Sequence, residues 1–145
     1  MFYLIYVSAA VRPMSEAELL EILETSRRNN EVSGLTGMLF YKEIVDADEA
    51  SFMQLLEGEE AAVMETYRRI VQDKRHDTLI ILERGPVEDR AFPDWSMGFR
   101  TVRPEDLARI PGFAHIKDES FDSPAFRNLP DGALDLMKTF YETIE

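Results

Sequence analysis

Runs of apolar residues with strand-like composition mark five predicted strands along the chain. The first, Phe2 to Ser8, is aromatic and β-branched, and its alternation puts Tyr6 on one face together with Leu4 and Phe2. The other four are predicted at Leu35–Tyr41, Ser51–Gly58, Thr78–Leu82 and Trp95–Val102. Because the run from Thr78 to Leu82 is apolar without alternation, we expect that strand to be buried on both faces.

Two segments have the spacing of amphipathic helices. The first begins after Ser15, which has capping-box spacing to Glu18, and should end near Arg28 to Asn30. The second, Glu59 to Asp73, gathers its apolar residues on one side. Between the second and third strands, Lys42 to Ala50 is acidic and lacks Gly and Pro, which predicts a long exposed hairpin loop.

The order β-α-β-β-α-β, followed by one more strand, predicts an α+β fold. It is the split βαβ arrangement of ferredoxin-like folds with an added fifth strand, and both helices should cover one sheet face. Residues 1–102 would form this unit. In residues 103–145 four prolines separate short helical pieces, and the last, Asp131 to Ile144, has an apolar stripe. We expect these pieces to cover the other sheet face as a C-terminal cap of the same domain.

Composition narrows the classes of protein. The chain has 145 residues, enough for one domain with a sizeable core, and no cysteine, which excludes disulfides, thiolate nucleophiles and cysteine metal sites. The net charge of −12 disfavours binding to nucleic acid. No leader-like or membrane-spanning apolar stretch stands out, so we expect a cytoplasmic protein without a membrane partner. We also expect no metal site.

The candidate chemistry begins at Gln54, an amide within a mostly apolar strand. A buried amide without hydrogen-bond partners is costly, so a neighbouring side chain or a bound polar ring should satisfy it. The predicted layout puts Tyr6 beside it, between the helix ends that carry Asn29-Asn30 and Asp73 to His76. Each of these taken alone has a structural explanation: a helix C-cap for the asparagines, a half-buried surface histidine, and a core tyrosine.

The ordered set resembles a known family, the BLUF domains, which sense blue light with FAD held between two helices of a ferredoxin-like fold. The resemblance covers residues 2 to about 102. The matching stretches are Leu4-Ile5-Tyr6-Val7-Ser8, Ser26-Arg27-Arg28-Asn29-Asn30, Leu35-Thr36-Gly37-Met38-Leu39-Phe40-Tyr41, Phe52-Met53-Gln54-Leu55-Leu56-Glu57-Gly58, Asp73-Lys74-Arg75-His76 and Phe92-Pro93-Asp94-Trp95-Ser96-Met97-Gly98-Phe99.

The resemblance implies roles for individual residues. Tyr6 matches the tyrosine that gives an electron and then a proton to the excited flavin, and Gln54 the glutamine whose amide then rearranges. Trp95 and Met97 match the fifth-strand pair that relays the signal. The FAD contacts implied by the resemblance are Tyr6, Ile22, Ser26, Asn29, Asn30, Leu39, Phe52, Gln54, Ile70, Asp73, Arg75 and His76. The chain departs from the family in the lengthened connection before Gln54, where a one-residue shift would turn Gln54 away from the flavin.

The residues leave two other hypotheses open beside a blue-light photoreceptor that is not an enzyme. One is a small acylphosphatase-like hydrolase that uses Arg75 with Asn30 on a phosphoryl group, although no Gly-rich phosphate loop precedes either helix. The other is a flavin-free interaction module in which Tyr6 and Gln54 only satisfy each other. The photoreceptor would signal by contact with a downstream protein, with the C-terminal helices as output; a homo-oligomer stays open.

Overall fold

The computed structural model describes residues 1–44, 48–92, 98–101, 133 and 136. Seven elements follow each other along this part of the chain. They are β1 (Phe2–Ala10), α1 (Glu16–Ser33), β2 (Thr36–Ile44), β3 (Glu49–Gly58), α2 (Glu60–Val71), β4 (His76–Pro86) and β5 (Gly98–Thr101).

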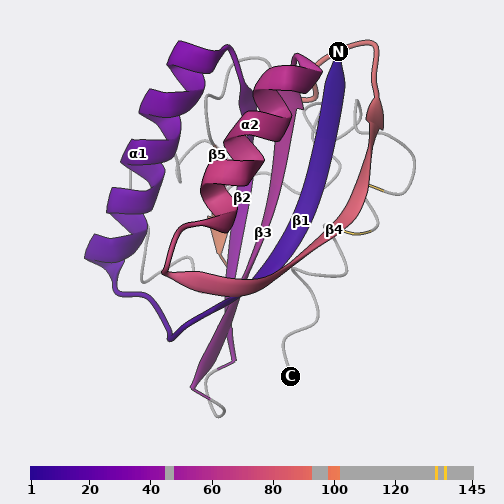
Figure 1. The fold of residues 1–145 in the computed structure, drawn as a ribbon. Helices are drawn as coiled ribbons and strands as arrows, with labels where there is room; N and C mark the ends of the chain where they lie inside the picture. The colour runs from indigo at the N-terminus through magenta and orange to yellow at the C-terminus, as the bar shows by residue number, and fades with distance from the viewer. Residues whose placement is uncertain (45–47, 93–97, 102–132, 134–135, 137–145) are drawn as a thin grey trace.

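The strands form one sheet with the order β4-β1-β3-β2-β5. The pairs β4–β1, β1–β3 and β3–β2 are antiparallel, whereas β5 joins β2 in parallel. Both helices lie on the same face of this sheet (Figure 1). The predicted α+β, ferredoxin-like fold with an added fifth strand is therefore confirmed. The predicted strand from Trp95 to Val102 is described only over Gly98–Thr101.

Two hydrophobic clusters fill the two faces of the sheet. On the helix face Leu4 and Tyr6 of β1 pack with residues of α1 and α2 such as Leu23 and Val63. On the opposite face Tyr3 and Ile5 pack with other apolar residues, among them Phe40, Phe92 and Ala133. The predicted alternation of the first strand is thus correct.

Little of the predicted C-terminal cap belongs to the described residues. Ala133 is fully buried within the cluster on the face opposite the helices, and the partly buried Leu136 packs against it. The other residues of the predicted helices in 103–145 lie outside the described residues.

The caps of α1 explain where this helix begins and ends. Ser15 and Glu18 form the predicted capping box, in which each side chain accepts from the other residue's backbone N–H, at 3.1 and 2.9 Å. The helix continues past the predicted end to Ser33, because Gly34, at φ 73°, takes the left-handed conformation that closes it. Asn30 is therefore a buried residue inside the helix and not its cap.

The segment between β2 and β3 is not the long exposed loop that its acidic composition predicted. Lys42, Glu43 and Ile44 continue β2 and pair with Ser51, Ala50 and Glu49 of β3. Lys42 and Ala50 are buried. Acidic side chains do not prevent a segment from pairing as a strand, so the count of acidic residues did not reveal this pairing. Asp48 lies in a turn, and Val45 to Ala47 lie outside the described residues.

The prediction that β4 is buried on both faces is wrong. It is an edge strand, and one of its faces is exposed to solvent. Ile80 and Leu82 are 53% and 39% exposed. The register with β1 shifts twice, between Ile5 and Tyr6 and between Val7 and Ala9, so bulges on either side bracket Tyr6 and Val7. Thr78 lies at the second shift with a φ of 54°, an unusual value for a β-branched residue.

Candidate functional site

A pocket with a volume of about 140 Å³ lies on the helix face of the sheet. Residues from α1, α2 and four strands, together with the turn after α2, line it. The twelve contacts implied by the family resemblance all belong to its lining: Tyr6, Ile22, Ser26, Asn29, Asn30, Leu39, Phe52, Gln54, Ile70, Asp73, Arg75 and His76. The remaining lining residues are Thr25, Thr66 and Arg69. Trp95 and Met97 lie outside the described residues.

Tyr6 and Gln54 form the polar centre of the pocket. They are direct neighbours in the antiparallel pairing of β1 with β3, and the Tyr6 hydroxyl donates a hydrogen bond to Gln54 Oε1 at 2.5 Å. The two side chains are only 3% and 4% exposed. The hairpin pairing is unbroken from Ile44–Glu49 to Leu39–Gln54, so the lengthened connection does not shift Gln54 away from this face.

Burial raises the pKa of the Tyr6 hydroxyl well above its ordinary value, and the nearby Tyr67 and Asp73 add to the effect. The Tyr67 ring contacts the Tyr6 ring edge-on, with centroids 5.6 Å apart. Tyr6 therefore stays a neutral phenol, able to donate its proton, over the whole physiological pH range.

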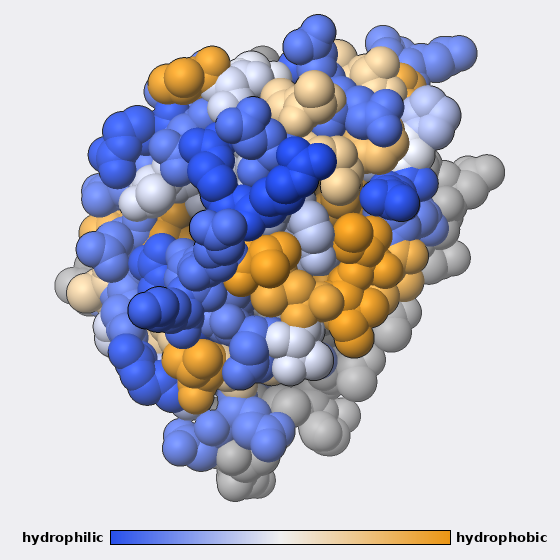
Figure 2. Space-filling view, viewed as in Figure 1, coloured by the Kyte–Doolittle hydropathy of each residue, from blue (hydrophilic) through white to orange (hydrophobic). Residues whose placement is uncertain are grey.

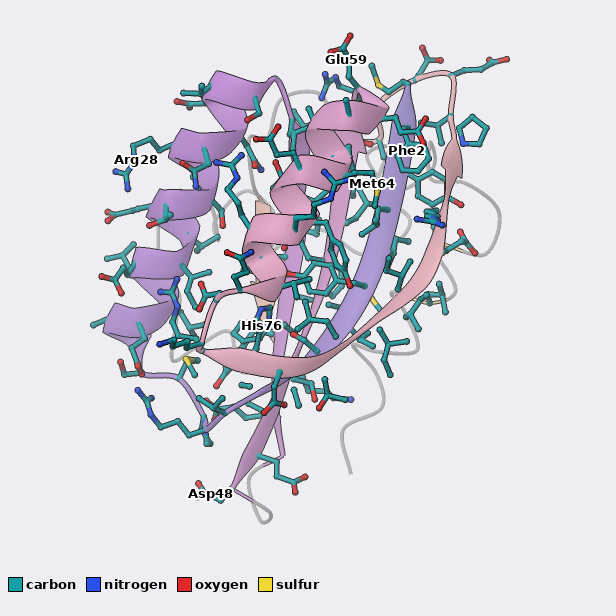
Figure 3. The ribbon with its side chains drawn as sticks, viewed as in Figure 1. Phe2, Arg28, Asp48, Glu59, Met64 and His76 are labelled. Carbon is teal, nitrogen blue, oxygen red and sulfur yellow. The ribbon has the colours of Figure 1, made fainter. Side chains whose placement is uncertain are left out.

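His76 closes the pocket at the start of β4, beneath the end of α2 (Figure 3). Its Nε2 lies 2.8 Å from the Ile70 carbonyl oxygen and its Nδ1 lies 2.8 Å from Ser8 Oγ. A carbonyl can only accept, so Nε2 carries the proton in this bond, and in the neutral ring Nδ1 accepts from the Ser8 hydroxyl. This tautomer locks the ring edge-on to Tyr6 and Phe52.

The turn after α2 supplies an ion pair at one end of the pocket. The Arg75 side chain donates to both Asp73 oxygens, with Nη2 2.6 Å from Oδ2, and its Nη1 lies 3.4 Å from Glu21 Oε1 on α1. Hydrogen bonding to Arg75 lowers the pKa of Asp73 despite partial burial. The same bond raises the pKa of Arg75. The guanidinium is thus held in one orientation beside the pocket.

The two helices run antiparallel, so the pocket has chemically different ends (Figure 1). Asn29 and Asn30 come from the C-terminal part of α1, at the end away from the Arg75–Glu21 contact. Asn30 is buried, at 1% exposure. Arg28 points outward from α1, away from α2 (Figure 3). The side chains of Ile22, Leu39 and Ile70 add apolar surface between the amide end and the charged end.

Sequence reasoning missed Thr25, Thr66 and Arg69. A helical signal could have found the last two, because Thr66, Arg69, Ile70 and Asp73 follow the i, i+3, i+4, i+7 spacing of one helix face. Thr66 is 7% exposed, and its Oγ1 is the one buried side-chain oxygen or nitrogen without a hydrogen-bond partner in the described part of the chain.

The arrangement suits a flat polar heterocycle. Amides can both donate and accept at the edge of such a ring, the guanidinium donates, and the aliphatic side chains can cover its faces. The unpartnered Thr66 hydroxyl also indicates that a polar ligand atom belongs in the pocket. Within the described residues no group of three His, Cys, Asp or Glu side chains could hold a metal ion.

A comparison with known families identifies the family of this chain. Residues 1–98 match the family model for BLUF, described as sensors of blue light using FAD. The chain belongs to the BLUF family. As a BLUF domain it is a flavin-binding photoreceptor for blue light, and this confirms the resemblance seen in the sequence.

Curated relatives of this BLUF domain are much longer proteins. The photoactivated adenylate cyclase subunit beta of Euglena longa is 36% identical over 109 residues, which cover 74% of this chain and 12% of the relative. The corresponding subunit of Euglena gracilis matches with the same identity and coverage. The BLUF domain thus spans about an eighth of the length of these relatives.

Solved structures share its fold. A bacterial light-regulated adenylyl cyclase is 30% identical with a TM-score of 0.61, over 71% of this chain and 28% of that one. BlrB, a BLUF protein in its dark state, is 28% identical with a TM-score of 0.64, over 99% of this chain and 96% of that one. Among the described residues of the BLUF domain, no helix has the length and apolar character needed to cross a membrane.

Proposed function

We propose that this BLUF domain holds FAD in the pocket between α1 and α2 and that Tyr6 and Gln54 are its light switch. The observation that carries the proposal is the buried hydrogen bond from the Tyr6 hydroxyl to Gln54 Oε1 at the pocket floor. When bound, the flavin absorbs blue light and becomes an oxidant strong enough to take an electron from a tyrosine.

The switch itself is a property of the two side chains. In the arrangement described here Gln54 presents its oxygen to Tyr6 and accepts the phenol proton's hydrogen bond. If the amide reverses, its NH2 group faces Tyr6 Oη, which can accept as well as donate. Each arrangement keeps one hydrogen bond between the two side chains, which gives the two states that a local switch requires. The surrounding side chains, Tyr67, Phe52 and His76, keep the pair away from water.

The other lining residues would hold the cofactor. Asn30 and the Asp73–Arg75 pair supply polar contacts at opposite ends, and Ile22 and Ile70 provide the apolar walls. Arg69 supports FAD over a flavin without phosphate, because this exposed cation lines the pocket and could meet a phosphate of the dinucleotide tail.

The absorption spectrum tests the proposal directly. The purified protein should be yellow, and its spectrum should shift reversibly to the red under blue light. The flavin released on denaturation should have the chromatographic mobility of FAD. A protein that stays colourless when FAD is added would refute FAD binding, and a light-insensitive spectrum would refute the switch.

The output belongs to the proposal as well. We assign residues 1–102 to the flavin-binding unit and residues 103–145 to an output segment of the same domain, with Trp95 and Met97 as relay residues. The burial of Ala133 against the sheet supports a C-terminal segment that rests on this domain. The relatives named as photoactivated cyclases support signalling to a downstream protein or domain. The cytoplasm stays the proposed location, which fractionation would test.

Deleting Asp131 to Glu145 tests the output segment. The truncated protein should keep its red shift and lose its light-dependent contact with a downstream partner. If partner binding still responds fully to light, the output lies elsewhere.

The hydrolase alternative finds no support in the site, because the Arg75 guanidinium is already engaged by Asp73 and Glu21.

A further inference from the structure

We infer that Thr66 is a ligand-binding residue whose hydroxyl donates a hydrogen bond to the ring of the bound flavin. This inference rests on the proposed function and names a contact that the family resemblance did not include. Three observations carry it: the burial of the side chain, the absence of a hydrogen-bond partner for its oxygen among the described residues, and its place in the pocket lining.

The unpartnered oxygen is the first step. A threonine inside a helix usually satisfies its hydroxyl by donating to a backbone carbonyl three or four residues earlier. Thr66 lies in the middle of α2, where Ala62 would offer that carbonyl, yet its Oγ1 makes no hydrogen bond to any residue that the structure describes. Buried polar groups of this kind are rare, and they mark positions where a ligand or water completes the contact.

The position along the helix selects the part of the ligand. Glu21 on α1 meets Arg75 beyond the end of α2, and the helices run antiparallel. Asn30 lies nine residues after Glu21, and Thr66 lies nine residues before Arg75. Thr66 lies within α2, whereas Asp73 and Arg75 follow its end, so Thr66 is away from the charged end and toward the side of the pocket lined by Asn30. Since both residues are buried, this end suits the polar edge of a ring better than a solvated tail.

The shape of Thr66 permits a clean test. Thr66→Val replaces the hydroxyl with a methyl group of nearly the same size, and Thr66→Ser keeps the hydroxyl while losing the methyl group. If the hydroxyl serves only the ligand, the valine variant should change the stability of the flavin-free protein and its flavin affinity in opposite directions. A hydroxyl with a purely structural role would not produce this combination.

The full chain, freed of flavin and then titrated with riboflavin or FAD, provides both measurements. Thr66→Val should weaken binding by about tenfold for each ligand, since a ring acceptor then loses its donor. Thermal unfolding without flavin should occur a few degrees higher than in the unchanged protein, because an unsatisfied buried hydroxyl has been removed. Thr66→Ser should bind both flavins within about threefold of the unchanged protein.

Each other outcome overturns the inference. Unchanged affinity in Thr66→Val, or a lower unfolding temperature without flavin, would show that the hydroxyl serves the protein. Weaker binding of FAD alone would place the contact on the tail and not on the ring. An equal loss in Thr66→Ser would assign the effect to the methyl group. The unchanged protein serves as the test of the proposed function, because its failure to bind flavin would refute that function separately.

Discussion

At the scale of single residues, the proposed switch depends on two side chains that the sheet itself holds together. Tyr6 and Gln54 occupy paired positions on adjacent antiparallel strands, and neither belongs to a loop. Side chains at such positions have their Cβ atoms within about 5.5 Å, so the sheet fixes their separation. The partner that a buried Gln54 requires is thus built into the register of β1 and β3.

The first prediction concerns Gln54. Gln54→Leu should leave a yellow protein that binds flavin but shows no red shift under blue light, because leucine cannot exchange a donor for an acceptor. Illuminated-minus-dark absorption spectra measure the effect. Met53→Leu is the matched control, since Met53 is the neighbouring buried residue on the opposite face of β3 and should leave the shift intact. A normal shift in Gln54→Leu would contradict the assignment of the switch.

The second prediction follows from the raised pKa of Tyr6. In the folded protein this hydroxyl remains protonated, whereas the unfolded chain ionises it near the ordinary pKa of 10.0. Its contribution to stability is therefore fully present below pH 10.0 and is lost as the pH rises further. Burial raises the pKa of Tyr3 to about 12, which adds to this alkaline loss in the same direction.

Denaturant unfolding between about pH 8 and pH 11 measures this dependence. The free energy of unfolding should fall above pH 10.0, and Tyr6→Phe should make the fall less steep, because phenylalanine has no proton to release on unfolding. Identical pH profiles for the two proteins would show that Tyr6 ionises equally easily in both states.

At the scale of elements, β3 connects the pocket with the opposite face of the sheet. Three residues after Gln54, the buried Glu57 carboxylate accepts from the backbone N–H groups of Ala91 and Phe92, each at 2.8 Å, and from the Thr36 hydroxyl. Arg90 supports this cluster by donating to Gly34 O and to Thr36 Oγ1. The chain after β4 is thereby fastened to the strand that carries Gln54.

The third prediction is that Glu57→Leu destabilises the domain by about 3 kcal/mol, because it leaves two backbone donors and a hydroxyl unsatisfied in a buried place. Chemical denaturation measures the change. Glu49→Leu, at the exposed start of the same strand, is the control and should change stability by no more than about 0.5 kcal/mol. A similar small effect at Glu57 would mean that water replaces the carboxylate without cost.

The fourth prediction concerns the end of α1. A Cβ atom added at Gly34 would meet no atom within 4 Å, so Gly34→Ala introduces no clash. Its φ of 73° still disfavours alanine, and we expect a loss of about 1 kcal/mol in the free energy of unfolding. Gly34→Asn should lose less, because asparagine tolerates the left-handed conformation. Equal stability of all three proteins would contradict this account of the helix end.

The sequence predicted the elements near the pocket better than the edges of the sheet. Strand alternation, the capping box and the order of the elements identified the face on which Tyr6 and Gln54 lie. The prediction that β4 is buried on both faces was wrong, because an apolar run does not distinguish a central strand from an edge strand with one exposed face. The prediction of an exposed acidic loop was wrong because Glu43 and Glu49 lie on residues whose backbone is paired. The place of Thr66 in the pocket was not predicted, because an unpartnered hydroxyl can be recognised only when the three-dimensional contacts are known.

At the scale of the whole molecule, the two faces of the sheet differ in what they contain. The helix face contains the pocket, and the other face carries the second hydrophobic cluster and the Glu57 contacts. Figure 2 shows a mainly hydrophilic surface over α1 and an apolar area over β4. Since the chain carries a net charge of −12, surfaces of this domain attract cations and repel acidic partners over a Debye length of about 8 Å.

The irregular edge at β4 has a consequence for self-assembly. An edge strand normally exposes a regular row of backbone donors and acceptors, which can template the strand of another copy. In β4 two register shifts, the left-handed Thr78 and the terminal Pro86 interrupt that row. A second copy therefore cannot extend the sheet along the whole of β4 by continuous strand pairing. Even though Ile80 and Leu82 are exposed there, the protein should resist growth into fibrils from this side at high concentration.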